Sequence, residues 1–260
     1  MPRPQIPKRD VVEALCKENG PKSNGFAYSD EIWIKYGEGV TLAEAAIQRY
    51  VHNNVDPRIV HVPEVFDEFS TTRLNAPPIT YIVMEIVKAD DYATHRTKNP
   101  REAEEALTAI ANAVRHIWDI PLPPNLSPGP FCQQEPVDRF FSDSGSGQIF
   151  NTLVELEVWI NTKLTEGDYQ DRVSFQGEQL CLCHCDLTQF NIMVSDRITI
   201  LDWGFAGIYP RAFDEFALIH QYNLIGQKFA KGLHQQLFGP KPSKSMRAMA
   251  LAARYHAYGW

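Results

Sequence analysis

The feature that most constrains this chain is a spaced set of oxygen-bearing side chains in its second half. Asp186 and Asn191 lie five residues apart, and Asp202 follows eleven residues later, directly after the mainly apolar stretch 198–201. Magnesium prefers such oxygen ligands and shares its coordination with phosphates and water. In phosphoryl transfer one carboxylate orients the attacking hydroxyl, while an amide and a second carboxylate hold the metal on the phosphates. The spacing therefore favours a fold that gathers these three side chains around magnesium and a nucleotide.

The first 90 residues predict a strand, helix and strand region. Three stretches have the composition of strands, at 25–28, 31–36 and 79–87. Between them, residues 41–51 predict a helix, because Thr41 is a suitable N-cap and Glu44 follows at the capping-box spacing.

From about Arg101 the pattern becomes helical. Apolar residues at helical spacing predict helices over 102–118 and 149–164. Residues 120–136 contain six prolines and a glycine, which predicts an extended surface connection, and 142–147 reads as a loop. The end of the chain, 213–258, is compatible with helix except for a break at 239–243.

Two motifs resemble those of a known family. The pattern His184-x-Asp186-Leu-x-x-x-Asn191 matches the catalytic loop shared by protein kinases and aminoglycoside phosphotransferases. The segment 200–207 is similar to the metal-binding segment of the phosphotransferases, in which Asp-Trp replaces Asp-Phe-Gly. Trp203 and the short separation of Asp186 from Asp202, 16 positions, favour the small-molecule branch. The resemblance implies that Asp186 is the catalytic base, that Asn191 and Asp202 hold Mg²⁺, and that ATP is the phosphoryl donor.

The resemblance also implies roles for residues upstream. Lys35 occupies the place of the phosphate-binding lysine, and Glu44 that of its ion-pair partner. The strand 81–87 resembles the entry to the hinge between lobes, where backbone groups from Glu85 to Val87 would meet adenine. The segment 20–25 departs from the Gly-x-Gly-x-x-Gly pattern, so Ser23 and Asn24 would supply donors to the phosphates there. Cys185 stands where the family usually has glycine.

The predicted fold class is α+β, a bilobal protein-kinase-like fold. Residues 1–87 would form a small N-lobe of antiparallel sheet plus one helix, and residues 88–260 a mostly helical C-lobe. The predicted activity is transfer of the γ-phosphoryl group of ATP to a hydroxyl of a small molecule. Two alternatives stay open: a catalytically silent nucleotide-binding or scaffold protein, and a protein kinase. Against the second, there is no Ala-Pro-Glu segment and no long activation loop after Asp202.

Four potential zinc ligands precede Asp186, namely Cys181, Cys183, His184 and Cys185. Structural zinc sites favour Cys-x-x-Cys turns with a second ligand pair, which this stretch lacks. The odd total of five cysteines also argues against a disulfide framework. We expect buried reduced thiols, with His184 holding the loop by hydrogen bonds. The pair Asp214-Glu215 either stabilises the C-lobe or contacts the acceptor.

Charge and hydropathy exclude some partners. The net charge of −7 at pH 7 argues against binding to duplex nucleic acid, whose phosphates require clustered Lys and Arg. No apolar run approaches the about 20 residues that a membrane-spanning helix needs. The first ten residues contain three prolines and four charges, unlike a secretory signal. We therefore expect a cytoplasmic protein with neither a membrane nor a nucleic acid as partner.

Overall fold

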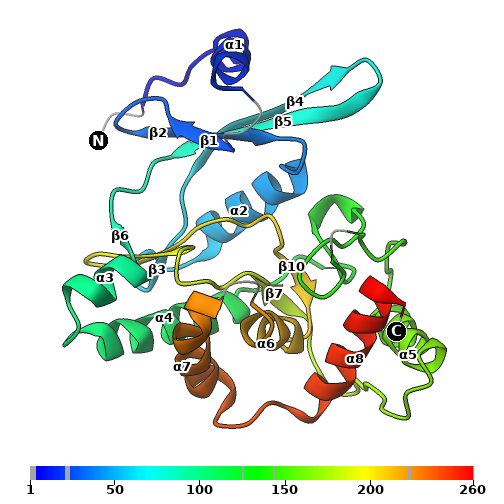
Figure 1. Ribbon diagram of the computed structural model, residues 1–260. Helices are drawn as coiled ribbons and strands as arrows, with labels where there is room; N and C mark the ends of the chain where they lie inside the picture. The colour runs from blue at the N-terminus through cyan, green and yellow to red at the C-terminus, as the bar shows by residue number, and fades with distance from the viewer. Residues whose placement is uncertain (1–3, 21–23, 125, 143, 222–223, 260) are drawn as a thin grey trace.

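The computed structural model describes residues 4–20, 24–124, 126–142, 144–221 and 224–259. An antiparallel sheet and two helices form a smaller N-terminal part, which lies above a larger, mostly helical part (Figure 1). This arrangement confirms the predicted α+β, kinase-like fold class.

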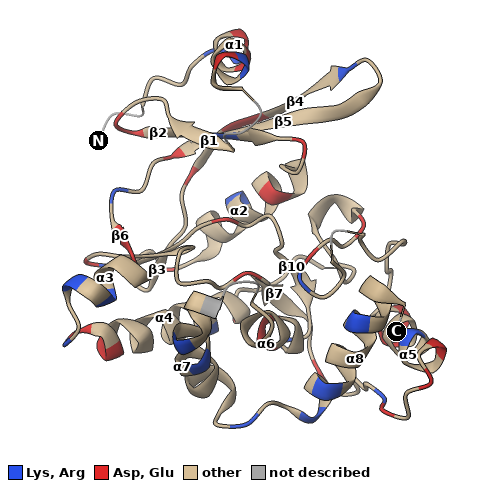
Figure 2. Ribbon diagram, viewed as in Figure 1, with Lys and Arg blue, Asp and Glu red and all other residues tan. Residues whose placement is uncertain are grey.

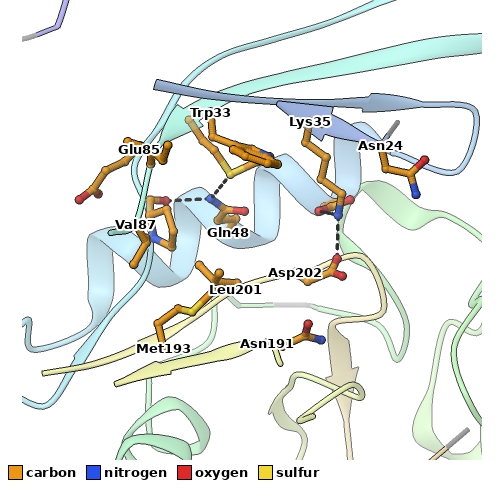
Figure 3. Close-up of a pocket in the computed structure, with 15 residues that line it drawn as sticks. Asn24, Trp33, Lys35, Gln48, Glu85, Val87, Asn191, Met193, Leu201 and Asp202 are labelled. Atoms are coloured by element: carbon orange, nitrogen blue, oxygen red, sulfur yellow. Dashed lines mark hydrogen bonds and ion pairs between the residues drawn. The ribbon is translucent and has the colours of Figure 1, made fainter. Parts of the chain in front are cut away.

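The N-terminal sheet is antiparallel throughout, and its strand order is β1-β2-β5-β4. The strands are β1 (Gly25–Ala27), β2 (Ile32–Gly37), β5 (Ala76–Glu85) and β4 (Val65–Arg73). Ile32, Ile34 and Tyr36 are buried on one face of β2. Because successive side chains of a strand alternate between faces, Trp33 and Lys35 share the opposite face, toward the cavity in Figure 3.

Three elements before residue 87 were not predicted: helix α1 (Arg9–Asn19), strand β4 and the two-residue strand β3 (Val60–His61). Helix α1 buries only Val12 and Cys16, so its apolar face is too narrow for a clear helical signal. Strand β4 carries charged and hydroxyl residues along most of its length because it is an edge strand. Its acidic residues form ion pairs with neighbouring arginines, Arg9 with Asp67 and Arg49 with Glu68.

Helix α2 (Leu42–Asn54) crosses beneath the sheet (Figure 1). The Thr41 hydroxyl accepts a hydrogen bond from the Glu44 amide at 3.1 Å, so the predicted N-cap is present. The α2 side chains of Ala45, Ile47 and Val51 are fully buried. Glu44 is also buried, although it is charged, and this placement requires a partner.

The larger part contains six α-helices among the described residues. They are α3 (Tyr92–Lys98), α4 (Ala103–Trp118), α5 (Leu153–Glu166), α6 (Ala212–Ile219), α7 (Gln227–Phe238) and α8 (Lys244–Tyr258). The predicted helices 102–118 and 149–164 correspond to α4 and α5, and the break at 239–243 separates α7 from α8. The connection 120–136 is irregular, with one short 3-10 turn, η1 (Phe131–Gln133).

Two small sheets lie between these helices and the N-terminal part. Strands β7 (Cys181–Cys183) and β10 (Gly207–Tyr209) form an antiparallel pair. The other sheet has the order β3-β9-β8-β6 and comprises β3 (Val60–His61), β9 (Ile198–Ile200), β8 (Ile192–Val194) and β6 (Asp90–Asp91). The parallel pairing of β3 with β9 joins the two parts of the chain. The lobe boundary at residue 87 remains a prediction.

Charged residues of both signs are scattered over the two parts of the molecule (Figure 2). Among the residues that the structure describes, no helix is both long and apolar enough to cross a membrane.

Candidate active site

Lys35 joins the two parts of the molecule at the centre of the site. Its Nζ lies 2.5 Å from Oε1 of Glu44 on α2 and 2.7 Å from Oδ1 of Asp202, which follows β9 (Figure 3). Strand β2 and helix α2, which are neighbours in the sequence, therefore meet the distant segment after β9 at one ammonium group. The predicted pairing of Lys35 with Glu44 is present in the structure.

Burial and mutual charge shift the pKa values of these three groups. Burial opposes the charge on Lys35, but the carboxylates of Glu44 and Asp202 raise its pKa above the usual value. Burial raises the pKa of Glu44, and the Lys35 ammonium at 2.5 Å opposes part of this rise. Asp202 is half exposed, and Lys35 outweighs its partial burial and lowers its pKa.

Asp186 and Asn191 are held together in the loop between β7 and β8. Nδ2 of Asn191 donates to Oδ2 of Asp186 and to the Asp186 carbonyl, both at 3.0 Å. The Leu201 amide donates to the Asn191 carbonyl at 2.8 Å, which ties this loop to the segment before Asp202. The sequence therefore brings Asp186, Asn191 and Asp202 to the same region, as their spacing predicted.

His184 connects the start of the loop that follows β7 to the segment before Asp202. It is buried, its Nε2 lies 2.9 Å from the Leu201 carbonyl, and its Nδ1 accepts from the Asp186 amide at 3.2 Å. These contacts place the imidazole proton on Nε2, because a carbonyl oxygen can only accept. The ring also meets Trp203 edge-on, at 4.8 Å between centroids. His184 thus has the structural role that the sequence predicts.

Cys185 has a left-handed backbone, with φ of 59°. Glycine adopts this conformation without strain, which accounts physically for the glycine usual at this position in the family. The strained turn is fixed by Asp214 of α6, whose Oδ1 accepts from the Cys185 amide at 2.8 Å and whose Oδ2 accepts from Trp118 Nε1 at 2.7 Å. Glu215 contacts His234 at 3.0 Å. Both acidic residues are buried supports of the C-terminal part.

A cavity of about 550 Å³ opens beside Lys35. Figure 3 shows the Trp33 indole above this space and Met193 and Leu201 below it. Gly25 on β1 leaves room for the indole, because a Cβ at this position would lie 2.7 Å from Trp33 Nε1. The result is a flat slot with an aromatic roof and an aliphatic floor.

The end of β5 and the two residues after it, 85–87, border this slot. The Glu85 carboxylate lies within 3.0 Å of His61 Nε2, and the Glu64 amide donates to it. Partial burial opposes ionisation of Glu85, but the contact with His61 lowers its pKa. The Glu85 amide donates to the Glu64 carbonyl and the Ile86 amide to the Glu31 carbonyl. The side chain and the amide of Glu85 are thus both used in hydrogen bonds within the protein. Val87 lines the cavity.

A second cavity, of about 700 Å³, continues from Lys35 toward Asp186. Phe205 and the loop 37–40 line it, and Asn24 borders both cavities. The predicted phosphate ligand Ser23 lies outside the described residues. From Asp202 to the start of α6 there are only a turn and β10, which leaves no room for the long activation loop of a protein kinase.

Sequence reasoning missed two residues of the site. Trp33 could have been found, because it precedes Lys35 by two positions on a strand and must share its face. Arg139 carried no signal, since it lies in the irregular segment before α5. Its Nε donates to Oδ1 of Asp186 at 2.8 Å, and its Nη2 contacts the same oxygen.

The three thiols just before Asp186 are buried and free. Sγ of Cys181 and Sγ of Cys183 lie 3.7 Å apart on one face of β7. Both lie near the Tyr209 carbonyl, whereas the His184 imidazole is directed to the Leu201 carbonyl. Within the described ranges, no group of three or more His, Cys, Asp or Glu side chains is arranged to hold a metal ion. The alternative of a zinc site thus gains no support from the geometry.

The two-part fold and its Lys, Glu and Asp cluster define a protein of the protein-kinase-like class. The chain belongs to the phosphotransferase enzyme family, whose model matches residues 39–244. This confirms the resemblance to aminoglycoside phosphotransferases. No curated protein sequence matches the chain.

Solved structures of aminoglycoside phosphotransferases have the same fold. The gentamicin complex of APH(2")-IIa has a TM-score of 0.52 at 12% identity, with 96% of this chain and 88% of that chain covered. The apo form of a thermostable APH(4)-Ia mutant has a TM-score of 0.56 at 14% identity, with coverage of 90% and 83%. ADP-bound APH(2'')-Ib has a TM-score of 0.51 at 12% identity, with coverage of 95% and 88%. At such identities the similarity establishes the fold alone.

Proposed function

We propose that this protein is an ATP-dependent kinase that transfers the γ-phosphoryl group to a hydroxyl of a small molecule. The observation that carries this proposal is the placement of Lys35. It contacts Glu44 and Asp202 between two cavities, one bordered by the hinge and the other by Asp186. This arrangement separates a nucleotide side from an acceptor side, with the charged groups at the boundary.

The slot beneath Trp33 suits adenine. An aromatic ring above and aliphatic side chains below bind a planar base through stacking and burial. At the proposed hinge, the Glu85 carbonyl and the Val87 amide would form hydrogen bonds with the edge of the base. Solved relatives in the same fold contain ADP, or AMP-PNP with hygromycin B, which supports an adenine nucleotide here.

The phosphates would lie beyond the slot, near Lys35 and Asn24. Lys35, oriented by Glu44, would bind the α- and β-phosphates as a point charge. Asn191 and Asp202 offer the amide and carboxylate oxygens that Mg²⁺ prefers, so these residues fit the metal. When bound, the metal would neutralise charge on the phosphates.

The acceptor would enter through the second cavity, which Asp186 borders. A hydroxyl held beside Asp186 attacks the γ-phosphorus, a new O–P bond forms, and the bond to the bridging oxygen breaks to release ADP. The hydroxyl proton passes to the Asp186 carboxylate. Structures of the same fold contain gentamicin or hygromycin B, which supports a small-molecule acceptor. Free thiols fit a reducing compartment such as the cytoplasm.

An ATP-consumption screen tests the proposal across amino alcohols, aminoglycosides, sugars and hydroxylated natural products. Asp186→Asn is the matched control, because it preserves the shape of the loop and removes the base. We expect turnover to fall by roughly a hundredfold to ten-thousandfold, with MgATP affinity retained in calorimetry. Equal turnover in the two proteins would remove Asp186 from the mechanism. MgATP binding by the wild type without phosphoryl transfer to any acceptor or to water would identify a catalytically silent protein.

A further inference from the structure

Arg139 holds the carboxylate that the proposed function assigns as base. Its side chain is 7% exposed, and its Nε and Nη2 both donate to Oδ1 of Asp186, the first at 2.8 Å. Asn191 donates to the other oxygen, Oδ2, at 3.0 Å. Arg139 at Oδ1 and Asn191 at Oδ2 therefore fix the orientation of the carboxylate plane. Oδ2, which accepts only from Asn191 among these donors, has a second lone pair for an acceptor hydroxyl.

The segment that presents Arg139 is anchored on both sides. Oδ1 of the buried Asp138 accepts from the Phe140 amide at 2.7 Å and from the Phe141 amide at 3.2 Å. Phe140 and Phe141 are themselves buried, and both rings pack against Phe213 of α6. Arg139 thus projects from a short turn that the hydrophobic core holds in place.

Stability alone does not account for this buried ion pair. Removing two charges from water is costly, and an apolar pair of similar volume is often equally or more stable. A guanidinium differs from an apolar residue in giving two directional, charge-assisted bonds that set the orientation of a carboxylate. Orientation is what a reacting group requires, because displacement of about 1 Å can reduce a rate about a hundredfold.

We propose that Arg139 is a positioning residue for Asp186. It keeps the carboxylate turned toward the acceptor cavity, and it does so through the rigid turn 138–141. The inference rests on the proposed function, because Asp186 matters only if phosphoryl transfer takes place. Arg139 acts through Asp186, so its removal affects the chemical step and leaves nucleotide binding intact.

The test compares Arg139→Met and Arg139→Lys with the wild type, using MgATP hydrolysis with water as the acceptor. We expect kcat to fall about 10- to 100-fold in Arg139→Met, with KM for ATP within about twofold. Arg139→Lys keeps the charge but loses the two-donor fork, so its kcat should be intermediate. In an Asp186→Asn background, Arg139→Met should cause no further loss, because both changes disable one contact. Arg9→Met, which removes a surface ion pair with Asp67, is the control.

Each other outcome overturns the inference. Unchanged kcat in Arg139→Met shows that Asp186 needs no such support, and a raised KM with unchanged kcat shows a nucleotide-binding role instead. Additive losses in the Asp186→Asn background separate the two residues. If Arg139→Met does not fold, wild-type kcat in Arg139→Lys suffices to refute the proposal. A wild type that neither binds nor hydrolyses MgATP refutes the proposed function itself, and this is seen before any variant is made.

Discussion

Asp138 makes the stability of this protein depend on pH. Its carboxyl is 2% exposed, and burial raises its pKa from 3.8 to about 7, although the Phe140 and Phe141 amides that donate to it oppose the rise. In the unfolded chain the same group ionises near its ordinary value. Folding therefore favours the protonated form of Asp138. As the pH rises above 3.8, this preference lowers the free energy of unfolding, and the loss is complete above about pH 7.

The sign and magnitude follow from linkage. Well below pH 3.8 the carboxyl is protonated in both states and has no effect on the free energy of unfolding. As the pH rises toward 7, the unfolded state loses its proton first, so the folded state becomes less stable. A rise from 3.8 to about 7, at about 1.4 kcal/mol for each pKa unit, corresponds to about 4 kcal/mol above pH 7.

Asp138→Asn removes this penalty and keeps an oxygen for the Phe140 and Phe141 amides. Urea unfolding of both proteins at pH 5 and pH 8 should show the variant gaining stability relative to wild type as pH rises, by about 3 kcal/mol across this range. Asp196→Asn, in the exposed turn between β8 and β9, controls for the loss of one negative charge. Parallel pH profiles for wild type and Asp138→Asn would refute the reasoning.

Three further predictions concern the proposed nucleotide site. Lys35→Met and Glu44→Gln should each weaken MgATP binding in calorimetry, the lysine change more strongly, and the double variant should fall short of additivity because the residues form one contact. Strictly additive losses would contradict the pairing. Asp202→Asn should abolish the magnesium dependence of nucleotide binding; an unchanged magnesium titration would place the metal elsewhere. Trp33→Ala should weaken ATP binding by about 1–3 kcal/mol through lost stacking, and equal affinity would show that adenine does not lie beneath the indole.

The sequence by itself determined the fold class and supplied the residues of the candidate site. The spacing of Asp186, Asn191 and Asp202 pointed to the segment that we propose as catalytic, because residue types and short-range spacing can be read directly from the sequence. Lys35 and Glu44 followed from the family resemblance. The Thr41 N-cap followed from local hydrogen bonding, which depends only on neighbouring residues.

Only the tertiary structure decided how distant segments meet. It placed Arg139 against Asp186, and it placed the Asp214 carboxylate where it accepts a hydrogen bond from the Cys185 amide. It also determined the burial that raises the pKa of Asp138. These contacts span tens of residues and depend on side-chain packing in the core. Periodicity and motif spacing describe neighbours along the chain, so they carry no information on which irregular segment the folded core places beside the catalytic loop.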